Sequence, residues 1–258
     1  MILGKNTKIQ NATFLSSVDE NPGFYADNIL TPDSGELYAV TEGTVILTID
    51  FDTITAQYLA LFNVTIETGI QIELYDTGTA ATIATYNYTT ANLCGYISKN
   101  LLVDNTDEAA TDFDRIIITS NGASSDFITS IGFLWAGDVL DFGCIETIQP
   151  SDNNADGVTI SRANTPDAQK RYKFQSFQVK TRKEIPFLTI RSNIRTIFEE
   201  GIGTPRPMWF PYETAFFGDI NLFYGILPVN KASYDPFYIK DNNSTFKSQI
   251  TIELQEVQ

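Results

Sequence analysis

The sequence predicts a mostly β protein, in which an N-terminal β-sandwich or jelly roll precedes a smaller α+β domain with one amphipathic helix across a sheet. Three observations predict this. Short segments that alternate apolar and polar residues dominate the first half. One segment in the second half has helical periodicity. The halves also differ in charge, because residues 1–150 hold 4 Lys and Arg against 20 Asp and Glu, whereas residues 151–258 hold 13 against 12.

The first half has the alternation of half-buried strands. Between residues 45 and 51, every second residue is apolar, and residues 70–74 repeat the pattern before an Asp-Thr-Gly turn. Clusters of Gly, Asn, Asp and Ser separate the further predicted strands, which are residues 56–66, 82–89, 113–120 and 126–140. Many short strands at this spacing are typical of a sandwich or jelly roll.

A turn-rich segment follows these strands. Residues 148–157 read IQPSDNNADG, which is the strongest turn and linker signal in the chain. We therefore predict a domain boundary near Pro150, with a discoidin-like jelly roll in residues 1–149 and an α+β domain in residues 150–258.

The second half begins with a predicted strand at residues 171–182. Four apolar residues then recur at intervals of three and four, with Pro186 near the start of the segment and Gly201 at its end, and these features predict a helix of about four turns. The four residues are Phe187, Ile190, Ile194 and Ile197. Residues 206–213, 219–228 and 245–257 predict further strands.

The composition excludes many kinds of chemistry. Without histidine, the chain has no Ser-His-Asp or Cys-His catalytic system and no histidine-bound metal. Cys94 and Cys144 lie fifty positions apart with no CxxC motif, so we expect buried thiols, with one disulfide as the alternative. We predict no enzyme, no metal and no cofactor. A glycan hydrolase based on two carboxylates stays open, because the separation of the acids in space decides it.

Membrane and secretion signals are also absent from the pattern. No apolar run approaches the ~20 residues that a membrane-spanning helix needs. The first residues, MILGKNTKIQN, lack the basic end and long apolar centre of a secretory signal, so we expect synthesis in the cytoplasm.

Two tryptophans are candidate contact residues. Trp135 lies in an apolar run that ends at a Gly-Asp turn, so we favour an apolar plug between two domains over a sugar-stacking surface. Trp209 lies in a proline-flanked aromatic segment, which suits an edge strand. That edge would face a neighbouring subunit or be covered by the chain's own loop, and the sequence does not decide between them.

Basic residues gather in the second half, and we expect some of them to contact acidic surface on another subunit, with a solvated face as the alternative. Nucleic acid is a poor partner for a chain with a net charge of -15 and no known binding motif. The predicted contact residues are Arg162, Arg171, Lys173, Arg182 and Arg195, and the wider basic segment adds Lys170, Lys180, Lys183 and Arg191.

Several runs resemble tail proteins of bacteriophages. Residues 21–40, 44–66 and 131–142 are similar, in order and spacing, to discoidin-like, galactose-binding-type jelly rolls, whose last strand ends in an Ile-Gly-aromatic-Leu-Trp-x-Gly run. The second half resembles the partner domain of the same proteins, with an Arg-containing start, a helix, the Pro-rich GTPRPMWFPYE, the Tyr-Gly run LFYGILP and an alternating last strand.

The resemblance implies a virion structural protein of the tail tip or baseplate, similar in kind to distal tail proteins. Such a protein would be made in the host cytoplasm and would form a homo-oligomeric ring, hexameric by analogy with tail symmetry, that connects the tail tube to other tail or host-recognition proteins. The alternative is a carbohydrate-binding module that acts in host attachment. The predicted loops show no basic and aromatic cluster that would form a saccharide pocket.

Overall fold

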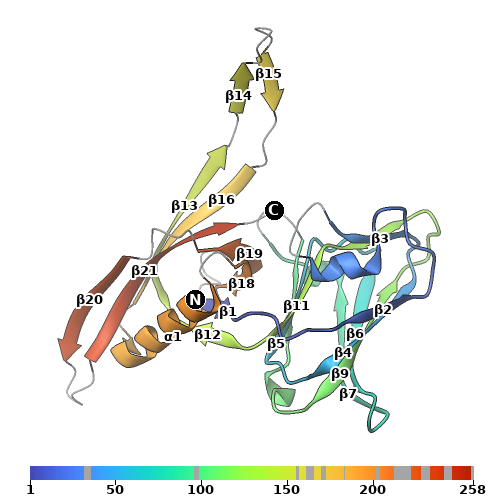
Figure 1. Ribbon diagram of the computed structural model, residues 1–258, viewed down its shortest axis with the longest axis horizontal. Helices are drawn as coiled ribbons and strands as arrows, with labels where there is room; N and C mark the ends of the chain where they lie inside the picture. The colour runs from blue at the N-terminus through green and yellow to red at the C-terminus, as the bar shows by residue number, and fades with distance from the viewer. Residues whose placement is uncertain are drawn as a thin grey trace. The chain divides into compact units, whose positions relative to one another are not determined.

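The computed structural model describes residues 1–31, 36–95, 99–154, 157–160, 166–169, 173–182, 184–201, 204–211, 222–227, 233–240 and 246–256. The protein is mostly β, as predicted, with several antiparallel sheets and one α-helix in the described part (Figure 1). The chain divides into two compact units. Unit 1 comprises Met1, Asp141–Arg206 and Tyr224–Gln258, and unit 2 comprises Ile2–Leu140 and Pro207–Phe223.

The first layer of unit 2 is a five-stranded antiparallel sheet in the order β2-β4-β9-β6-β7. Its inner face follows the predicted alternation, because Val45, Leu47, Ile49 and Phe51 are all buried. Ile49 lies opposite Phe14 on one side and Ile116 on the other, so apolar rows cross the sheet. The strands are β2 (Thr13–Ser16), β4 (Val45–Ile54), β6 (Gly69–Asp76), β7 (Ala81–Thr89) and β9 (Phe113–Asn121).

The second layer of unit 2 contributes to the same apolar core. It contains the three-stranded sheet β11-β5-β8 and the pair β10-β3, so unit 2 is a β-sandwich. Its strands are β3 (Tyr38–Thr41), β5 (Tyr58–Phe62), β8 (Leu101–Asp104), β10 (Ile128–Ile131) and β11 (Phe133–Gly137). Three short 3-10 helices, η1 (Ala26–Leu30), η2 (Thr90–Asn92) and η3 (Thr106–Glu108), lie in the connections.

The strand predicted over residues 126–140 is divided in the structure. It forms β10, β11 and β12 (Val139–Asp141), and β10 pairs with β3 whereas β11 pairs with β5. The change of partner occurs at Gly132, where an added Cβ would lie 2.7 Å from the Cβ of Asn63. A glycine therefore permits the close approach of two backbones at this change of sheet.

Unit 1 contains helix α1 (Phe187–Glu200), which confirms the helix predicted from the periodicity. Pro186 is its N-cap residue, and Gly201 follows it with a φ of 98°, a conformation that favours glycine. Ile190 and Ile197 are buried on one face of the helix. The helix packs against β21 (Phe246–Glu256) and β17 (Ile185–Pro186), so a helix does lie against a sheet.

Strand β21 is the centre of the sheet in unit 1. It pairs with β16 (Lys173–Thr181), β17, β20 (Ser233–Lys240) and the end of β19 (Leu222–Ile226). Figure 1 labels β16, β19 and β20 near it. Ile250, Ile252 and Leu254 are buried, which confirms the alternation predicted for the last strand.

The turn predicted at Pro150 is not formed. Pro150 lies within β13 (Ile145–Asn154), opposite Phe177 of β16, because the long ladder between β13 and β16 outweighs the local preference for a turn. Strands β14 (Gly157–Ile160) and β15 (Pro166–Gln169), which come between β13 and β16 in the sequence, pair with each other. We call strands β13, β14, β15 and β16 together the long hairpin.

Candidate functional site

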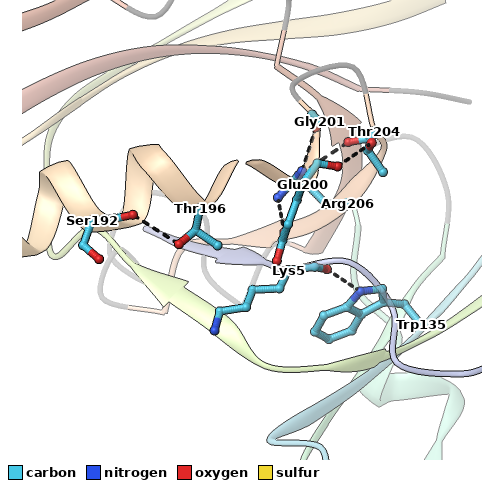
Figure 2. Close-up of polar contacts among 8 residues, drawn as sticks. All are labelled: Lys5, Trp135, Ser192, Thr196, Glu200, Gly201, Thr204 and Arg206. Carbon is cyan, nitrogen blue, oxygen red and sulfur yellow. Dashed lines mark hydrogen bonds and ion pairs between the residues drawn. The ribbon is translucent and has the colours of Figure 1, made fainter. Parts of the chain in front are cut away.

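Trp135 lies on β11 inside unit 2 and is 1 % exposed. Its indole Nε1 donates a hydrogen bond of 2.9 Å to the carbonyl oxygen of Lys5 (Figure 2). A Cβ added at Gly4 or at Gly137 would lie 2.8 or 2.9 Å from the indole ring, so small residues surround it. A ring enclosed in this way has no open face for a sugar, and Trp135 is a core residue of unit 2.

Trp209 is also buried within unit 2, at 2 % exposure. It lies on β18 (Arg206–Trp209) opposite Ile2 of β1 (Ile2–Gly4), and its ring centroid is 5.0 Å from that of Tyr58. Strand β18 lies between β1 and β19 in its sheet, so the prediction of an edge strand was wrong, because β1 pairs along it. Contact of either tryptophan with another subunit stays a prediction.

The predicted basic contact residues that the structure describes belong to unit 1. Arg162 and Arg171 lie outside the described residues, and Lys173 begins β16. Arg182 is 3.9 Å from Glu184, and Arg195 on α1 is 2.7 Å from Glu199. Both arginines are exposed, and exposed ion pairs of this kind contribute little stability, typically about 0–1 kcal/mol. Their role in subunit contacts stays a prediction.

The sequence did not indicate the buried arginine of unit 1. The Arg206 side chain has no exposed surface, and its guanidinium is 3.1 Å from a Glu200 carboxylate oxygen (Figure 2). It also donates to the Gly201 carbonyl at 2.9 Å and to the Thr204 carbonyl at 3.4 Å. Burial lowers the Arg206 pKa, and the Glu200 charge opposes that shift. The cation therefore lies at the C-terminal end of α1, where a positive charge stabilises a helix.

Burial also shifts the pKa of several tyrosines. It raises the pKa of Tyr88 to about 12, and it raises the pKa of Tyr38 and Tyr224 above the usual value. These shifts move the hydroxyls further from neutral pH, so they do not prepare these groups for proton transfer.

A loop of unit 2 exposes two adjacent aromatic rings. Phe24 is 39 % and Tyr25 is 52 % exposed, just before η1. The loop is held by polar contacts, because the Ala26 backbone N–H donates to a Glu20 carboxylate oxygen at 3.0 Å and the Asn28 amide donates to two backbone carbonyls. We call Phe24 and Tyr25 the aromatic pair. Sequence reasoning missed it, because two adjacent aromatic residues in a loop carry no periodic pattern.

The interior of unit 2 contains a cavity of about 10 Å³ between its two layers. That volume is about the size of one water molecule, so a sugar would not fit. The hydroxyls of Ser120 and Thr129, which line it, already donate to the backbone carbonyls of Gly43 and Glu42. The cavity is a packing gap and not a ligand site.

In a chain without histidine, thiol and carboxylate side chains are the remaining candidate metal ligands. Within the ranges given above, no group of three or more Cys, Asp or Glu side chains is placed to hold a metal ion.

Cys94 and Cys144 are partly exposed, so the expectation that both thiols lie in a core was wrong. Cys94 forms an isolated β-bridge with Asn100, and Cys144 directly precedes β13, so neither lies within a strand of the core. No described helix combines the length and apolar character that a bilayer span requires.

Comparison with known proteins adds a likeness of fold for half of the chain. No family model and no curated protein matches the sequence. Solved structures with a similar arrangement include chitosan-binding module 1 of a chitosanase/glucanase from Paenibacillus sp. IK-5, at 16 % identity and a TM-score of 0.40 over 51 % of this chain and 98 % of that chain.

Two further solved structures are also similar to about half of this chain. CpGH89CBM32-5 from Clostridium perfringens, in complex with GalNAc-β-1,3-galactose, has 10 % identity and a TM-score of 0.37 over 49 % of this chain and 95 % of that one. A structure of reduced XRCC1 bound to the DNA polymerase β catalytic domain has 12 % identity and a TM-score of 0.38, over 51 % and 97 %. Because identities and TM-scores are both low, we draw no functional conclusion from these likenesses.

Proposed function

We propose that the protein is a non-catalytic structural protein that assembles with copies of itself through the long hairpin of unit 1. The hairpin carries this proposal. β13 and β16 pair from Ile145↔Thr181 to Asn154↔Lys173, but β16 pairs with β21 only through residues 176–180. Beyond that region, the described strands of the hairpin pair only with each other.

A two-stranded ribbon without a third strand is marginally stable in water. Both of its edges also present backbone N–H and C=O groups to solvent. A neighbouring copy that covers these edges would add a further strand and would pair the exposed backbone groups. Addition of a strand to an open sheet edge is a common mode of recognition. The long hairpin is therefore suited to an assembly contact.

For the finer role, we propose a bacteriophage tail tip or baseplate, in which the chain is the subunit of a ring that contacts other tail proteins. The ordered resemblance of both halves to tail proteins supports this role, and the long hairpin supports its self-assembly. The proposed location is the tail of the virion.

Shortening the long hairpin tests the assembly. In the variant, an Asn-Gly turn replaces residues 155–172 and joins Asn154 to Lys173, which already lie opposite each other. We expect the wild-type chain to form oligomers in light-scattering chromatography and the variant to have the mass of a monomer. Circular dichroism should show the same secondary structure apart from the lost strands. A variant that keeps the wild-type mass contradicts the proposal.

Glycan binding by unit 2 is a second candidate, and the aromatic pair favours it. The C–H face of a sugar ring packs well on an aromatic ring, and the fixed loop lowers the entropy that binding would lose. Asp27, two residues after Tyr25, is exposed and could accept hydrogen bonds from sugar hydroxyls. In this role, unit 2 would contact a surface glycan while unit 1 forms the assembly.

Replacing Tyr25 with alanine tests this second candidate. If a glycan array identifies a ligand, the Tyr25→Ala variant should bind it about tenfold more weakly, a loss of ~1.4 kcal/mol. Ile128→Ala is the matched control, because Ile128 is exposed to a similar extent, 54 %, on the same unit. Equal binding by both variants, or an array without any bound glycan, counts against this function.

A further inference from the structure

Helix α1 exposes an apolar and basic strip to solvent. Leu188, Arg191, Arg195 and Phe198 follow one another at intervals of three and four residues, so their side chains share one face. Leu188 is 72 % and Phe198 is 57 % exposed. We call these four residues the helix strip. The opposite face of α1, with Ile190 and Ile197, is buried in unit 1.

The helix strip places two large apolar side chains in contact with solvent. Contact of these side chains with water is unfavourable. Burying each of them against a partner would stabilise the complex. Arg195 is held in the pair with Glu199, whereas Arg191 makes no ion pair with any described residue. A partner for this strip therefore has to offer apolar surface together with negative charge.

Unit 2 has a surface with these two properties. On the outer face of its five-stranded sheet, Leu15 is 70 % exposed and Ile46 is 44 % exposed, on the neighbouring strands β2 and β4. Unit 2 also contains 20 Asp and Glu against 4 Lys and Arg. We call this surface the outer sheet face.

On the outer sheet face, one carboxylate is already paired within unit 2 and another remains as a candidate partner for arginine. Asp50 is already bridged by Arg115, whose guanidinium reaches both of its carboxylate oxygens. Glu73 lies in the row that runs from Leu15 through Thr48 and Ile117, three strands away. At a strand spacing of about 4.8 Å, this places Glu73 roughly 14 Å from Leu15.

The helix strip has a matching length. Leu188 and Phe198 are ten residues apart, which corresponds to about 15 Å along a helix. If Phe198 packs on Leu15 and Ile46, Arg191 lies about 10 Å further along and its long side chain extends toward Glu73. One helix lying across the strands would therefore cover the apolar end and the acidic end of the row together.

We propose that the helix strip of one copy docks on the outer sheet face of a second copy. The inference rests on the proposed self-assembly and names a second contact beside the long hairpin. A second helix strip is a poorer partner, because arginine would then face arginine. Nucleic acid is a poorer partner as well, because the chain carries a net charge of -15. The apolar residues would supply affinity, and the charges would set orientation and partner choice.

Photo-cross-linking between isotopically distinct copies tests the contact. We would replace Phe198 with p-benzoylphenylalanine in the full chain, mix ¹⁵N-labelled and unlabelled protein, and identify the joined peptides by mass spectrometry. We expect mixed-isotope products that join position 198 to peptides from β2 or β4. The same amino acid at Ile128 is the control and should not yield these products. Products within one copy only, products with another surface, or no products overturn the inference.

Charge reversal separates this inference from the proposed function. The double variant Arg191→Glu and Arg195→Glu should weaken self-association about tenfold or more, whereas Arg191→Lys with Arg195→Lys should keep most of it. Circular dichroism would confirm that α1 is retained. If the charge-reversed chain associates like the wild type while the chain with the shortened hairpin is monomeric, the helix contact is wrong and the proposed function stands. If both are monomeric, both proposals are supported.

Discussion

Replacing Arg206 with methionine is expected to destabilise unit 1 by about 3 kcal/mol. Removing one partner of a buried ion pair typically costs about 3–5 kcal/mol, because the other charge loses its compensation. The lower end applies here, since the Glu200 side chain remains 21 % exposed and keeps some contact with water. The Gly201 carbonyl at the end of α1 would also lose a donor at 2.9 Å.

Urea unfolding followed by circular dichroism at 222 nm measures this loss, because α1 lies in unit 1. Both tryptophans lie in unit 2, so their fluorescence reports on the other unit and should change less. Arg206→Lys is the matched control. It keeps the charge but lacks the planar fork that bonds several oxygens, so an intermediate loss is expected. Full stability of the methionine variant would contradict the structural role of this cation.

Replacing Trp135 with alanine is expected to destabilise unit 2 by about 4 kcal/mol. Large-to-small changes at buried tryptophan or phenylalanine cost about 3–5 kcal/mol, because apolar contacts are lost and a cavity remains. The Lys5 carbonyl, which accepts the indole hydrogen bond at 2.9 Å, would also lose its donor. Gly4 and Gly137 next to the ring cannot fill the space.

Equilibrium unfolding followed by the fluorescence of Trp209 gives the measurement, since Trp209 lies in the same unit. Trp135→Phe keeps most of the ring volume and should lose clearly less stability than Trp135→Ala. A glycan assay with Trp135→Ala would report folding and not recognition, which is why Tyr25 is the residue to change. Unfolding of Trp135→Ala at the wild-type urea concentration would show that this side chain is not a core anchor.

A strand or helix that is buried on one face can be predicted from the sequence, because its apolar residues recur at a fixed interval. The alternation from Val45 to Phe51 predicts β4 because that face lies in the core of unit 2. The periodicity around Ile190 and Ile197 predicts α1 for the same reason, since those residues face the interior of unit 1. Such patterns record a local consequence of packing, so a local reading of the sequence finds them.

The sequence did not predict features that local periodicity does not record, such as pairing with strands far away in the chain. Pro150 belongs to a strand because β16 pairs along its whole length, and no nearby residue signals that partner. The strand predicted at residues 126–140 changes sheets at Gly132 because β3 and β5 lie in different sheets. Arg206 is buried beside the end of α1, and the periodicity of the helix does not extend to residue 206.

The candidate binding residues also differ in how far the sequence indicated their positions. Phe24 and Tyr25 are exposed on a loop that contacts of Glu20 and Asn28 hold in place, and this arrangement follows from the fold and not from spacing. Trp135 was predicted as an apolar plug in preference to a sugar-stacking surface, and it is buried. Aromatic identity alone therefore predicts neither a binding surface nor a core position.

The mass of the full-length chain in solution tests the assembly most directly. Sedimentation velocity over a range of micromolar concentrations would determine it, with the chain that carries the shortened hairpin measured in parallel. We expect the wild-type chain to sediment as a closed oligomer of one size and the shortened chain as a monomer. A wild-type chain that remains monomeric at every concentration would contradict self-assembly through the long hairpin.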